Sequence, residues 1–438
     1  MSDMGANVRK TALELLRSYE MEGRYVNLLL SSPKLSSFTR EETALLTTLL
    51  YTTVENKLRY DYLICKLSKR GMDSIDPFVR DVIRLGMCQI LDMRSIPDFA
   101  AVNETVKLAR HNGERSFANA VLRECIRVKD SLPYPERAKN EQRYLSVRYS
   151  VPLATVKLLS SVFGDDTERL LDSFGKTSPL SLTVNTRKVT RDELIKRFSE
   201  YGATASRYSA NGIRLEKSVP PTALDGFARG EFFVQDEASR IEAMALDAKE
   251  GECVIDVCAA PGGKTLAAAI AVGDGGRVYS FDLHASKLSL IEESVKRLGI
   301  NCVTVAERDA TAPDESLFGK ADRVICDVPC SGLGVIGKKP DLRYKEISSA
   351  DELVPLQKQI LSCSAKYLRA GGVIVYSTCT LNPAENEGVV RAFLEENPDF
   401  SVLPIALDGK ESQGIGITLT PFEHGTDGFY IAKLRKNK

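Results

Sequence analysis

Apolar residues recur at helical spacing along the first third of the chain. Between residues 43 and 67 they lie three or four positions apart, and Pro77, a residue favoured in the first turn of a helix, opens a second such stretch. A third stretch ends at Asn112-Gly113, which is a typical helix stop. The pattern predicts an all-α domain over residues 1–135.

The pattern of hydrophobic positions changes twice after this region. Residues 131–142 are polar, contain two prolines and predict a linker. Short helical stretches then surround the strand-like run Leu180-Ser-Leu-Thr-Val-Asn185, which predicts a small α+β domain over residues 143–232. The remainder, residues 233–438, is expected to form a third domain.

In the third domain short apolar runs alternate with helical stretches. The runs are residues 253–258, 277–282, 302–305, 323–327 and 372–377. Buried strands alternating with helices predict a parallel, doubly wound α/β sheet, and hence a Rossmann-like domain. Such sheets bind ligands at the carboxyl ends of their strands.

Composition adds little to this organisation, and charge adds an asymmetry. The chain has 438 residues, of which 43% are hydrophobic and 27% charged, and its net charge is zero. Residues 1–130 and 131–240 each carry a net charge of +3, whereas residues 241–438 carry −6. The asymmetry indicates a nucleic-acid-binding part joined to a part with a different role.

Membrane, secretory and metal-binding classes find no support in the sequence. No apolar run approaches the roughly 18 residues of a membrane helix, and the start has no signal-peptide pattern. The ten cysteines are scattered without a Cys-x-x-Cys pair, which favours reduced thiols and a cytoplasmic protein. His111, His284 and His424 are also scattered, so no metal site is expected.

A glycine-containing loop follows the first predicted strand of the third domain. It reads Asp256-Val-Cys-Ala-Ala-Pro-Gly-Gly-Lys-Thr265. A phosphate-binding loop needs glycine where Cys258 stands, and the dinucleotide pattern Gly-x-Gly-x-x-Gly is absent. The small residues still let a ligand approach the backbone next to a helix N-terminus. The candidate cofactor contacts in this loop are Cys258, Ala259, Ala260, Pro261, Gly262, Gly263 and Lys264.

Aspartates follow the next two strands. Asp282 ends the second strand, where its carboxylate can accept hydrogen bonds from ribose hydroxyls, and Asp309 follows the third, where it can accept from an adenine amine. Each feature alone is compatible with an ordinary βα turn and a helix cap. Together they favour S-adenosylmethionine as cofactor.

Two cysteines occupy the ends of the fourth and fifth strands. They stand in Asp327-Val-Pro-Cys330 and in Tyr376-Ser-Thr-Cys379. A lone cysteine is usually a small buried hydrophobe, an interpretation kept for Cys65, Cys88, Cys125 and Cys363. Two thiols at one sheet edge suit another role, because addition of a thiolate to C6 of cytosine activates C5 toward a sulfonium methyl group.

This reaction also needs a second group that assists release of the thiolate and an acid near cytosine N3 and N4, for which Asp327 is suitably placed. The target base must be unstacked. A cationic run follows the Cys330 motif and contains Lys338, Lys339, Arg343 and Lys345 beside a tyrosine. Such a run is usually a solvated loop, but here it predicts contacts with RNA phosphates.

The strand-end motifs resemble those of the Sun family of RNA cytosine-5 methyltransferases. The specific segments are the loop Asp256–Thr265, Asp327-Val-Pro-Cys-Ser-Gly-Leu-Gly334, and Tyr376–Thr380 with Glu385-Asn-Glu387. The amino-terminal part is similar to the family's NusB-like helical domain, which favours its ribosomal branch. The sequence departs from the family pattern at Val328, where alanine is usual, and at Val151, where histidine is common.

The resemblance implies a role for each matching residue. It implies that Cys379 is the nucleophile and that Cys330 assists release, an order that spacing alone leaves open. It implies cofactor contacts from Cys258 to Lys264 and from Asp282, Asp309 and Asp327. The implied substrate is a cytosine in the helix 31 loop of 16S rRNA, and neither DNA nor a membrane is expected as a partner.

Two other functions stay open at this level. A transfer RNA cytosine-5 methyltransferase would use the same chemistry on another substrate. A non-catalytic RNA-binding assembly or antitermination factor is suggested by the helical domain alone. The second alternative leaves the glycine loop, Asp327 and the cysteine pair without a purpose.

Overall fold

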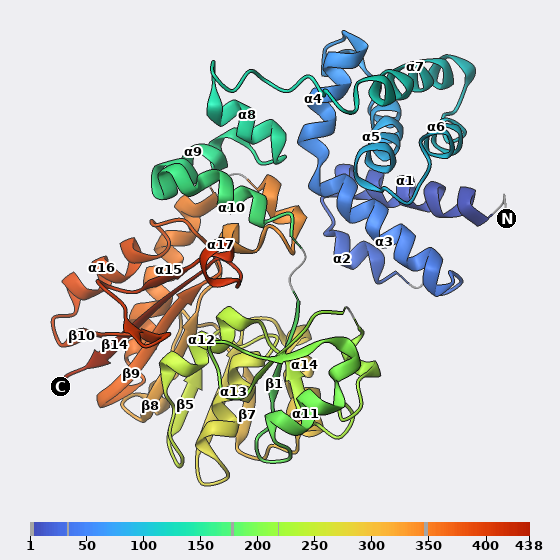
Figure 1. Ribbon diagram of the computed structural model, residues 1–438. Helices are drawn as coiled ribbons and strands as arrows, with labels where there is room; N and C mark the ends of the chain where they lie inside the picture. The colour runs from blue at the N-terminus through green and yellow to red at the C-terminus, as the bar shows by residue number, and fades with distance from the viewer. Residues whose placement is uncertain (1–3, 33–34, 177–178, 218, 346–348) are drawn as a thin grey trace. The chain divides into compact units, whose positions relative to one another are not determined.

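The computed structural model describes residues 4–32, 35–176, 179–217, 219–345 and 349–438 (Figure 1). Its contacts divide the chain into two units. The helical unit contains the described residues up to Gly175 together with Lys339–Lys345. The sheet-containing unit contains the described residues of Lys176–Lys338 and those from Ser349 onward. Each unit is considered by itself.

The helical unit is all-α, as the sequence predicts for its first part. Its helices are α1 (Met4–Glu22), α2 (Val26–Leu30), α3 (Arg40–Glu55), α4 (Lys57–Ser68), α5 (Pro77–Asp92), α6 (Asp98–Val106), α7 (Asn112–Val128), α8 (Glu141–Arg148), α9 (Leu153–Phe163) and α10 (Thr167–Ser173). Helix α5 packs against α1, α3, α4, α6 and α7 and forms the centre of the core.

Local sequence explains where α5 begins and how closely it packs. The Asp76 carboxylate accepts a hydrogen bond from Phe78 N at 2.8 Å, and Pro77 occupies the first turn. Gly86 then allows α7 to approach, because a Cβ atom there would lie 2.6 Å from the Leu122 side chain. The buried face of α5 therefore depends on a cap at one end and on a glycine in its middle.

A short 3-10 helix, Pro340–Tyr344, belongs to the helical unit although its sequence neighbours belong to the other. The Asp341 carboxylate accepts from Val26 N at 3.0 Å, and the Tyr344 hydroxyl donates to Glu55 O at 2.8 Å. Helices α8 to α10 also belong to this unit, although the sequence pattern predicts them in a middle domain starting at residue 143. The boundaries at 135, 143 and 232 remain a proposal.

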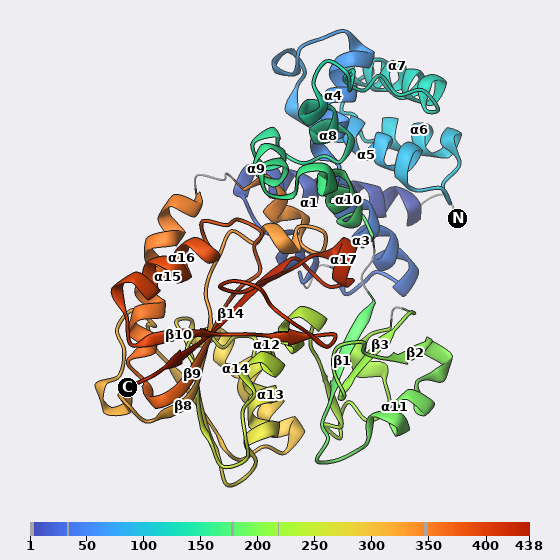
Figure 2. The same ribbon diagram turned by 60° about the vertical axis from the view of Figure 1, so that its left-hand side comes forward.

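A small antiparallel sheet begins the sheet-containing unit and confirms the predicted α+β module (Figure 2). Its strands are β1 (Leu180–Val184), β2 (Ala203–Ala205), β3 (Gly212–Leu215) and β4 (Phe232–Val234), in the order β2-β3-β1-β4, with helix α11 (Arg191–Arg197) between β1 and β2 in the chain. Leu182, Ile213 and Phe232 are fully buried in its core, where the rings of Phe198 and Phe232 pack edge to face.

The main sheet has the order β10-β14-β9-β8-β5-β6-β7, with β13 paired to β14. Its strands are β5 (Cys253–Asp256), β6 (Arg277–Asp282), β7 (Val303–Glu307), β8 (Ala321–Asp327), β9 (Leu368–Thr378), β10 (Phe400–Leu403), β13 (Ile417–Leu419) and β14 (Phe429–Lys436). The five strands β5 to β9 are parallel, as predicted, whereas β10, β13 and β14 add an antiparallel edge. Residues Ala406–Leu407 (β11) and Lys410–Glu411 (β12) form a separate hairpin.

Helices cover both faces of this sheet. They are α12 (Glu237–Leu246), α13 (Gly263–Val272), α14 (Ala285–Leu298), α15 (Ser349–Ala365) and α16 (Glu387–Glu396), and a short α17 (Pro421–His424) precedes β14. Helices α12 and α13 share one apolar core with β5 and β14, while α15 and α16 share another with β8 and β9. Figure 2 shows α15 and α16 together on the face away from α12 and α13. The carboxyl ends of the parallel strands therefore meet along one edge.

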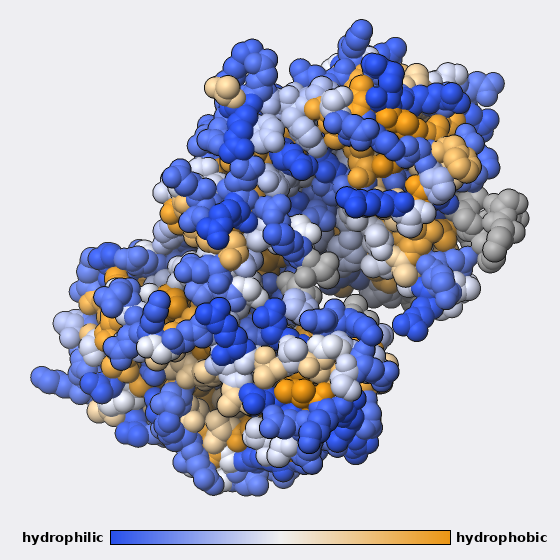
Figure 3. Space-filling model, in the orientation of Figure 1, coloured by the Kyte–Doolittle hydropathy of each residue, from blue (hydrophilic) through white to orange (hydrophobic). Residues whose placement is uncertain are grey.

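Hydrophilic residues predominate on the face shown in Figure 3, with apolar residues visible between them. Within the part of the chain that the structure describes, no helix is both long enough and apolar enough to cross a membrane.

Candidate active site

The loop after β5 is held by the ends of its neighbours. Ala259 N donates to Phe281 O at 2.7 Å, and Ala260 N donates to the Asp282 carboxylate at 3.1 Å. Gly262 has a φ of +107° and ends the loop at the start of α13, a backbone conformation that favours glycine. Asp282 thus lies against the loop, and its contact with the cofactor stays a prediction.

A pocket of about 570 Å³ opens next to this loop. Its lining combines loop residues with β4 and the end of β8, and includes Cys258, Pro261, Lys264, Asp327, Phe233 and Gln235. Gln235 links the loop to the small sheet, because its side-chain amide donates to Gly263 O at 3.2 Å and its side-chain oxygen accepts from the Thr183 hydroxyl at 2.7 Å. The small antiparallel sheet therefore supplies one wall of the pocket.

Asp309 lies after β7 in a local turn. Its carboxylate accepts from Thr311 N at 2.8 Å and from the Thr311 hydroxyl at 2.7 Å. The Thr311 hydroxyl and backbone amide lower the pKa of this carboxyl because both hydrogen bonds favour its charged form. Asp309 does not line the pocket beside the loop, so its role toward a cofactor stays a prediction.

The two cysteines at the strand ends lie together. The Sγ atoms of Cys330 and Cys379 are 3.3 Å apart, and both residues are half-buried. The hydrogen bond with Cys379, reinforced by burial, raises the pKa of the Cys330 thiol above its usual range. Cys330 therefore keeps its proton at neutral pH and can donate it toward the sulfur of Cys379.

A buried carboxylate fixes the loop that carries Cys330. Glu385 is fully buried and accepts hydrogen bonds from Ser331 N at 2.8 Å and from the Ser331 hydroxyl at 2.5 Å. Gln357 of α15 reaches the same carboxylate at 3.1 Å and also donates to Pro329 O. The family resemblance singles out the segment around Glu385, whereas no spacing signal points to Gln357.

Asp327 and Lys264 form an ion pair beside the cysteines. Lys264 Nζ lies 2.6 Å from Asp327 Oδ2, and the Ser377 hydroxyl donates to Asp327 Oδ1 at 3.0 Å. The nearby carboxylates, against the opposing effect of burial, raise the pKa of Lys264 above its usual range, so the amine stays charged. The Asp327 carboxylate keeps 27% of its surface exposed and faces the pocket.

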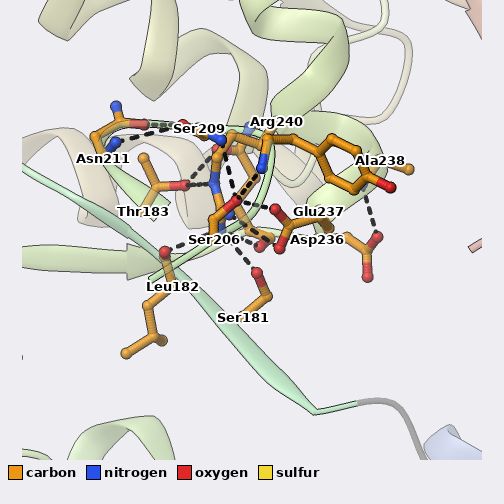
Figure 4. A network of polar contacts seen from close by, with 12 residues as sticks. Ser181, Leu182, Thr183, Ser206, Ser209, Asn211, Asp236, Glu237, Ala238 and Arg240 are labelled. Atoms are coloured by element: carbon orange, nitrogen blue, oxygen red, sulfur yellow. Dashed lines mark hydrogen bonds and ion pairs between the residues drawn. The ribbon is translucent and has the colours of Figure 1, made fainter. Parts of the chain in front are cut away.

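A buried arginine joins α12 to the small sheet (Figure 4). The Arg240 guanidinium donates to the Thr183 hydroxyl at 2.9 Å, to Ser181 Oγ at 2.8 Å and to Leu182 O at 2.9 Å. It also pairs with Glu237 at 3.3 Å. Because Arg240 is 2% exposed and holds β1 against α12, it fixes the wall of the pocket relative to the main sheet.

The cationic run is divided between the two units, and the RNA contacts expected for it stay a prediction. The Arg343 side chain is 3% exposed, donates to Glu55 O and Tyr149 O, and pairs with the Glu55 carboxylate. Its guanidinium is thus used inside the helical unit. Lys338 belongs to the sheet-containing unit and pairs with Asp236 and Asp427.

Lys339 and Lys345 are exposed at the two ends of the segment Lys339–Lys345. These two lysines, together with Lys338, stay candidates for RNA contact. No group of three or more potential metal ligands occurs among the described residues.

The fold and the strand-end site together define a Rossmann-like methyltransferase preceded by helical and α+β modules. Family profiles match all three parts: "NusB family" over residues 6–127, "Methyltr_RsmF/B-like, ferredoxin-like domain" over 152–222, and "16S rRNA methyltransferase RsmB/F" over 243–435. A curated relative from Bacillus subtilis, "Probable ribosomal RNA small subunit methyltransferase B", is 34% identical over 98% of this chain and 99% of its own length. The chain belongs to the RsmB/F family of methyltransferases, which confirms the resemblance.

Other relatives and solved structures agree. "Ribosomal RNA small subunit methyltransferase B" of Klebsiella pneumoniae is 30% identical over 99% of both chains. The crystal structure of PH0851 has 26% identity and a TM-score of 0.79, and covers 100% of this chain and 99% of its own. That of a methyltransferase homolog protein from Pyrococcus horikoshii has 29% identity and a TM-score of 0.60, over 68% of this chain and 99% of its own.

Proposed function

We propose that this protein transfers a methyl group from S-adenosylmethionine to C5 of a cytosine in 16S ribosomal RNA. The observation that carries the proposal is the pair of thiols, Cys330 and Cys379, 3.3 Å apart beside the Asp327 carboxylate. Methyl transfer to an oxygen or an exocyclic nitrogen needs no thiol pair, because those atoms already hold a nucleophilic lone pair. Carbon C5 of cytosine lacks one and needs covalent activation.

The residues around the β5–α13 loop fit a nucleoside cofactor. The loop offers small side chains from Cys258 to Gly263, so that a ligand can approach the backbone, and Asp282 lies against it. In the proposed complex Asp282 accepts from the ribose hydroxyls, Asp309 from the adenine amine, and the loop with Asp327 borders the rest of the molecule. When bound, the cofactor supplies an electrophilic methyl group on a sulfonium.

The residues at the strand ends perform the remaining chemistry. The Cys379 thiolate forms a bond to C6 of the cytosine, and the ring electrons move so that C5 takes the methyl group. Asp327 hydrogen-bonds N3 and N4 and offsets the charge that develops on the ring. A base, water in this scheme, then takes the C5 proton, the C–H electrons re-form the C5–C6 double bond, and the C6–S bond breaks. The Cys330 thiol hydrogen-bonds the Cys379 sulfur as it leaves as a thiolate.

The assignment to ribosomal RNA rests on the relatives and on the amino-terminal module. The curated relatives carry small-subunit ribosomal RNA methyltransferase names over their full length, and the NusB profile matches the helical unit. A cytosine in the helix 31 loop is the proposed target, since an enzyme can unstack a loop base at little energetic cost. The transfer RNA alternative shares the chemistry and differs only in this substrate.

Cofactor binding separates the enzyme from a non-catalytic RNA-binding factor. In titration calorimetry we expect one S-adenosylmethionine to bind per chain, and Asp282→Ala to weaken binding by about tenfold or more, since the variant loses a charge-assisted hydrogen bond to the ribose. Asp274→Ala is the control, because the Asp274 side chain is 75% exposed and pairs only with Arg187 among the described residues. Absence of heat with the wild-type protein contradicts the proposed function.

A further inference from the structure

A buried glutamate of α12 lies behind the Lys264–Asp327 pair. Glu242 is 1% exposed, and its carboxyl group lies close to the Ser377 hydroxyl of β9. Its Oε2 atom lies 3.3 Å from Lys264 Nζ. Among the described residues, the Lys264 ammonium is the one ion-pair partner of this carboxyl group. Its burial requires a physical explanation, because a carboxyl group is costly to bury as an anion.

The three side chains form a line that leads from the protein interior to the pocket. Lys264 Nζ stands between Glu242 Oε2 at 3.3 Å and Asp327 Oδ2 at 2.6 Å. Exposure of the side chains rises along this line, from 1% for Glu242 to 13% for Lys264 and 27% for Asp327. Of the three, Lys264 and Asp327 line the pocket and Glu242 does not. Lys264 therefore offers a path for a proton from Glu242 to the pocket.

The charges around Glu242 come from the elements packed against α12. They are Lys264 of α13, Asp327 at the end of β8 and Asp256 of β5, while β9 contributes the uncharged hydroxyl of Ser377. Three carboxyl groups thus share one ammonium in a buried cluster. The three carboxyl groups are not all ionised at the same time at neutral pH, because two of their three negative charges would then remain uncompensated.

Burial favours the protonated form of the two inner carboxyl groups of the cluster. Burial raises the pKa of Glu242 to about 8, and burial likewise raises that of Asp256 to about 7. Asp256 is engaged by Thr265, whose hydroxyl donates to it at 2.7 Å, and neither Asp256 nor Thr265 lines the pocket. Glu242 is therefore the carboxyl group of the cluster that holds a proton at neutral pH and also contacts the Lys264 ammonium, which pairs with Asp327.

We propose that Glu242 is a positioning residue that stores a proton for Asp327, with Lys264 as the relay; this inference rests on the proposed function. As the Cys379 thiolate adds to the base, Lys264 gives a proton to Asp327 and takes one from Glu242. The Glu242 carboxyl becomes a carboxylate, the Asp327 carboxylate becomes a carboxyl, and Lys264 stays an ammonium. The net charge of the cluster is unchanged, and Asp327 can donate a hydrogen bond to N3 of the activated ring.

The test compares the wild-type protein with Glu242→Gln in single-turnover methyl transfer to RNA between pH 6 and pH 9.5. The raised pKa means that Glu242 keeps its proton below about pH 8 and loses it above. We expect the wild-type rate to fall as pH rises through about 8. Glu242→Gln should be about 10- to 100-fold slower at pH 7, since it lacks the proton source, and should not show this fall. Its affinity for S-adenosylmethionine should be unchanged.

Glu252→Gln is the matched control. Glu252 makes a bidentate pair with Arg323, at 2.9 and 3.0 Å, where β5 begins, at the opposite edge of the same sheet. The same change in side-chain charge at this position should leave the pH profile as in the wild type. A second measurement does not depend on turnover: carbon-13 NMR of the full chain labelled at the glutamate carboxyl carbon, with the Glu242 resonance assigned by its absence in Glu242→Gln.

Each result decides the inference. A Glu242 resonance that titrates near pH 8, together with the altered profile of Glu242→Gln, supports it. A resonance that titrates near pH 4.5, or a Glu242→Gln profile equal to that of the wild type, overturns it. Absence of methyl transfer to any RNA by the wild-type protein would instead overturn the proposed function, and the two failures are distinguishable because the first leaves wild-type activity intact.

Discussion

Replacing Cys379 with alanine should abolish methyl transfer, by about 10³-fold or more, and leave no protein–RNA adduct. The proposed reaction starts with a bond between this sulfur and C6 of cytosine, so without the thiolate neither the bond nor activation of C5 can form. Rate is measured by transfer of label from S-adenosylmethionine to RNA, and the adduct by a band of low mobility on a denaturing gel.

Replacing Cys330 with alanine should have the opposite effect on the adduct. The Sγ atoms lie 3.3 Å apart, and the raised pKa of the Cys330 thiol keeps a proton beside the sulfur that must depart. Without that thiol, Cys379 should remain attached to RNA, and the band should accumulate. If the band appears with Cys379→Ala instead, the two roles are reversed, since the geometry of the pair alone is symmetrical.

Cys363→Ala is the control for both variants. Cys363 lies on α15 in the same unit, where its thiol reaches Thr311 O at 3.4 Å, outside the strand-end site. The variant should methylate RNA at the wild-type rate and show no band. A loss of activity with Cys363→Ala equal to that of Cys379→Ala would indicate general sensitivity of the fold to cysteine replacement and would contradict the assignment.

The largest effect on stability is expected in the helical unit, from Arg84→Ala. Arg84 is 2% exposed, and its guanidinium makes two hydrogen bonds to Asp61, at 2.7 and 2.6 Å, and one to Asp81 at 2.9 Å. Removing it leaves the buried Asp81 with a weaker counter-charge, the partly exposed Arg17 at 3.2 Å. Breaking a buried pair in this way destabilises a protein by about 3–5 kcal/mol.

The effect of Arg84→Ala should depend on pH. Burial, against the opposing charge of Arg84, raises the pKa of Asp81 to about 6, so this group already binds its proton more tightly in the folded than in the unfolded state. Loss of Arg84 raises that pKa further, so the destabilisation should be smaller at pH 5 than at pH 8. Hydrogen exchange of the α5 amides in the full chain measures it locally.

Arg127→Ala provides the comparison on a helix surface. Arg127 is 71% exposed and pairs with Glu124 three residues earlier on α7. Solvent screens an exposed pair, which contributes little to stability, so exchange from α5 should stay near that of the wild type. Equal protection of α5 in Arg84→Ala and Arg127→Ala would contradict a structural role for the buried pair.

Much of the fold could be predicted because its signals are local. A strand buried on both faces is a short apolar run, and the five parallel strands β5 to β9 coincide with such runs. The location of the site could also be predicted, because residues at the carboxyl ends of parallel strands lie along one edge of the sheet. The order of strands and helices along the sequence therefore suffices to bring Asp282, Asp327, Cys330 and Cys379 into one region.

What could not be predicted depends on long-range packing. Arg343 follows the Cys330 motif in sequence, yet its guanidinium is buried beside Glu55, 288 positions earlier, and nothing in the local pattern indicates that pairing. Glu242 lies in an amphipathic helix where a charged residue usually faces solvent, but α12 is covered on this side by the main sheet. The antiparallel direction of β14 also could not be predicted. The direction of a strand depends on how the chain connects it to its neighbours in the sheet, and the apolar run of the strand itself does not indicate it.

The central claim is that this protein forms 5-methylcytidine in small-subunit ribosomal RNA. The most direct measurement incubates it with radiolabelled S-adenosylmethionine and, separately, with unmodified 16S rRNA or transfer RNA, and then digests each RNA to nucleosides. We predict label in 5-methylcytidine from 16S rRNA alone. Label in another nucleoside, or in neither RNA, would contradict the claim, and label in 5-methylcytidine from transfer RNA alone would retain the chemistry but contradict the substrate.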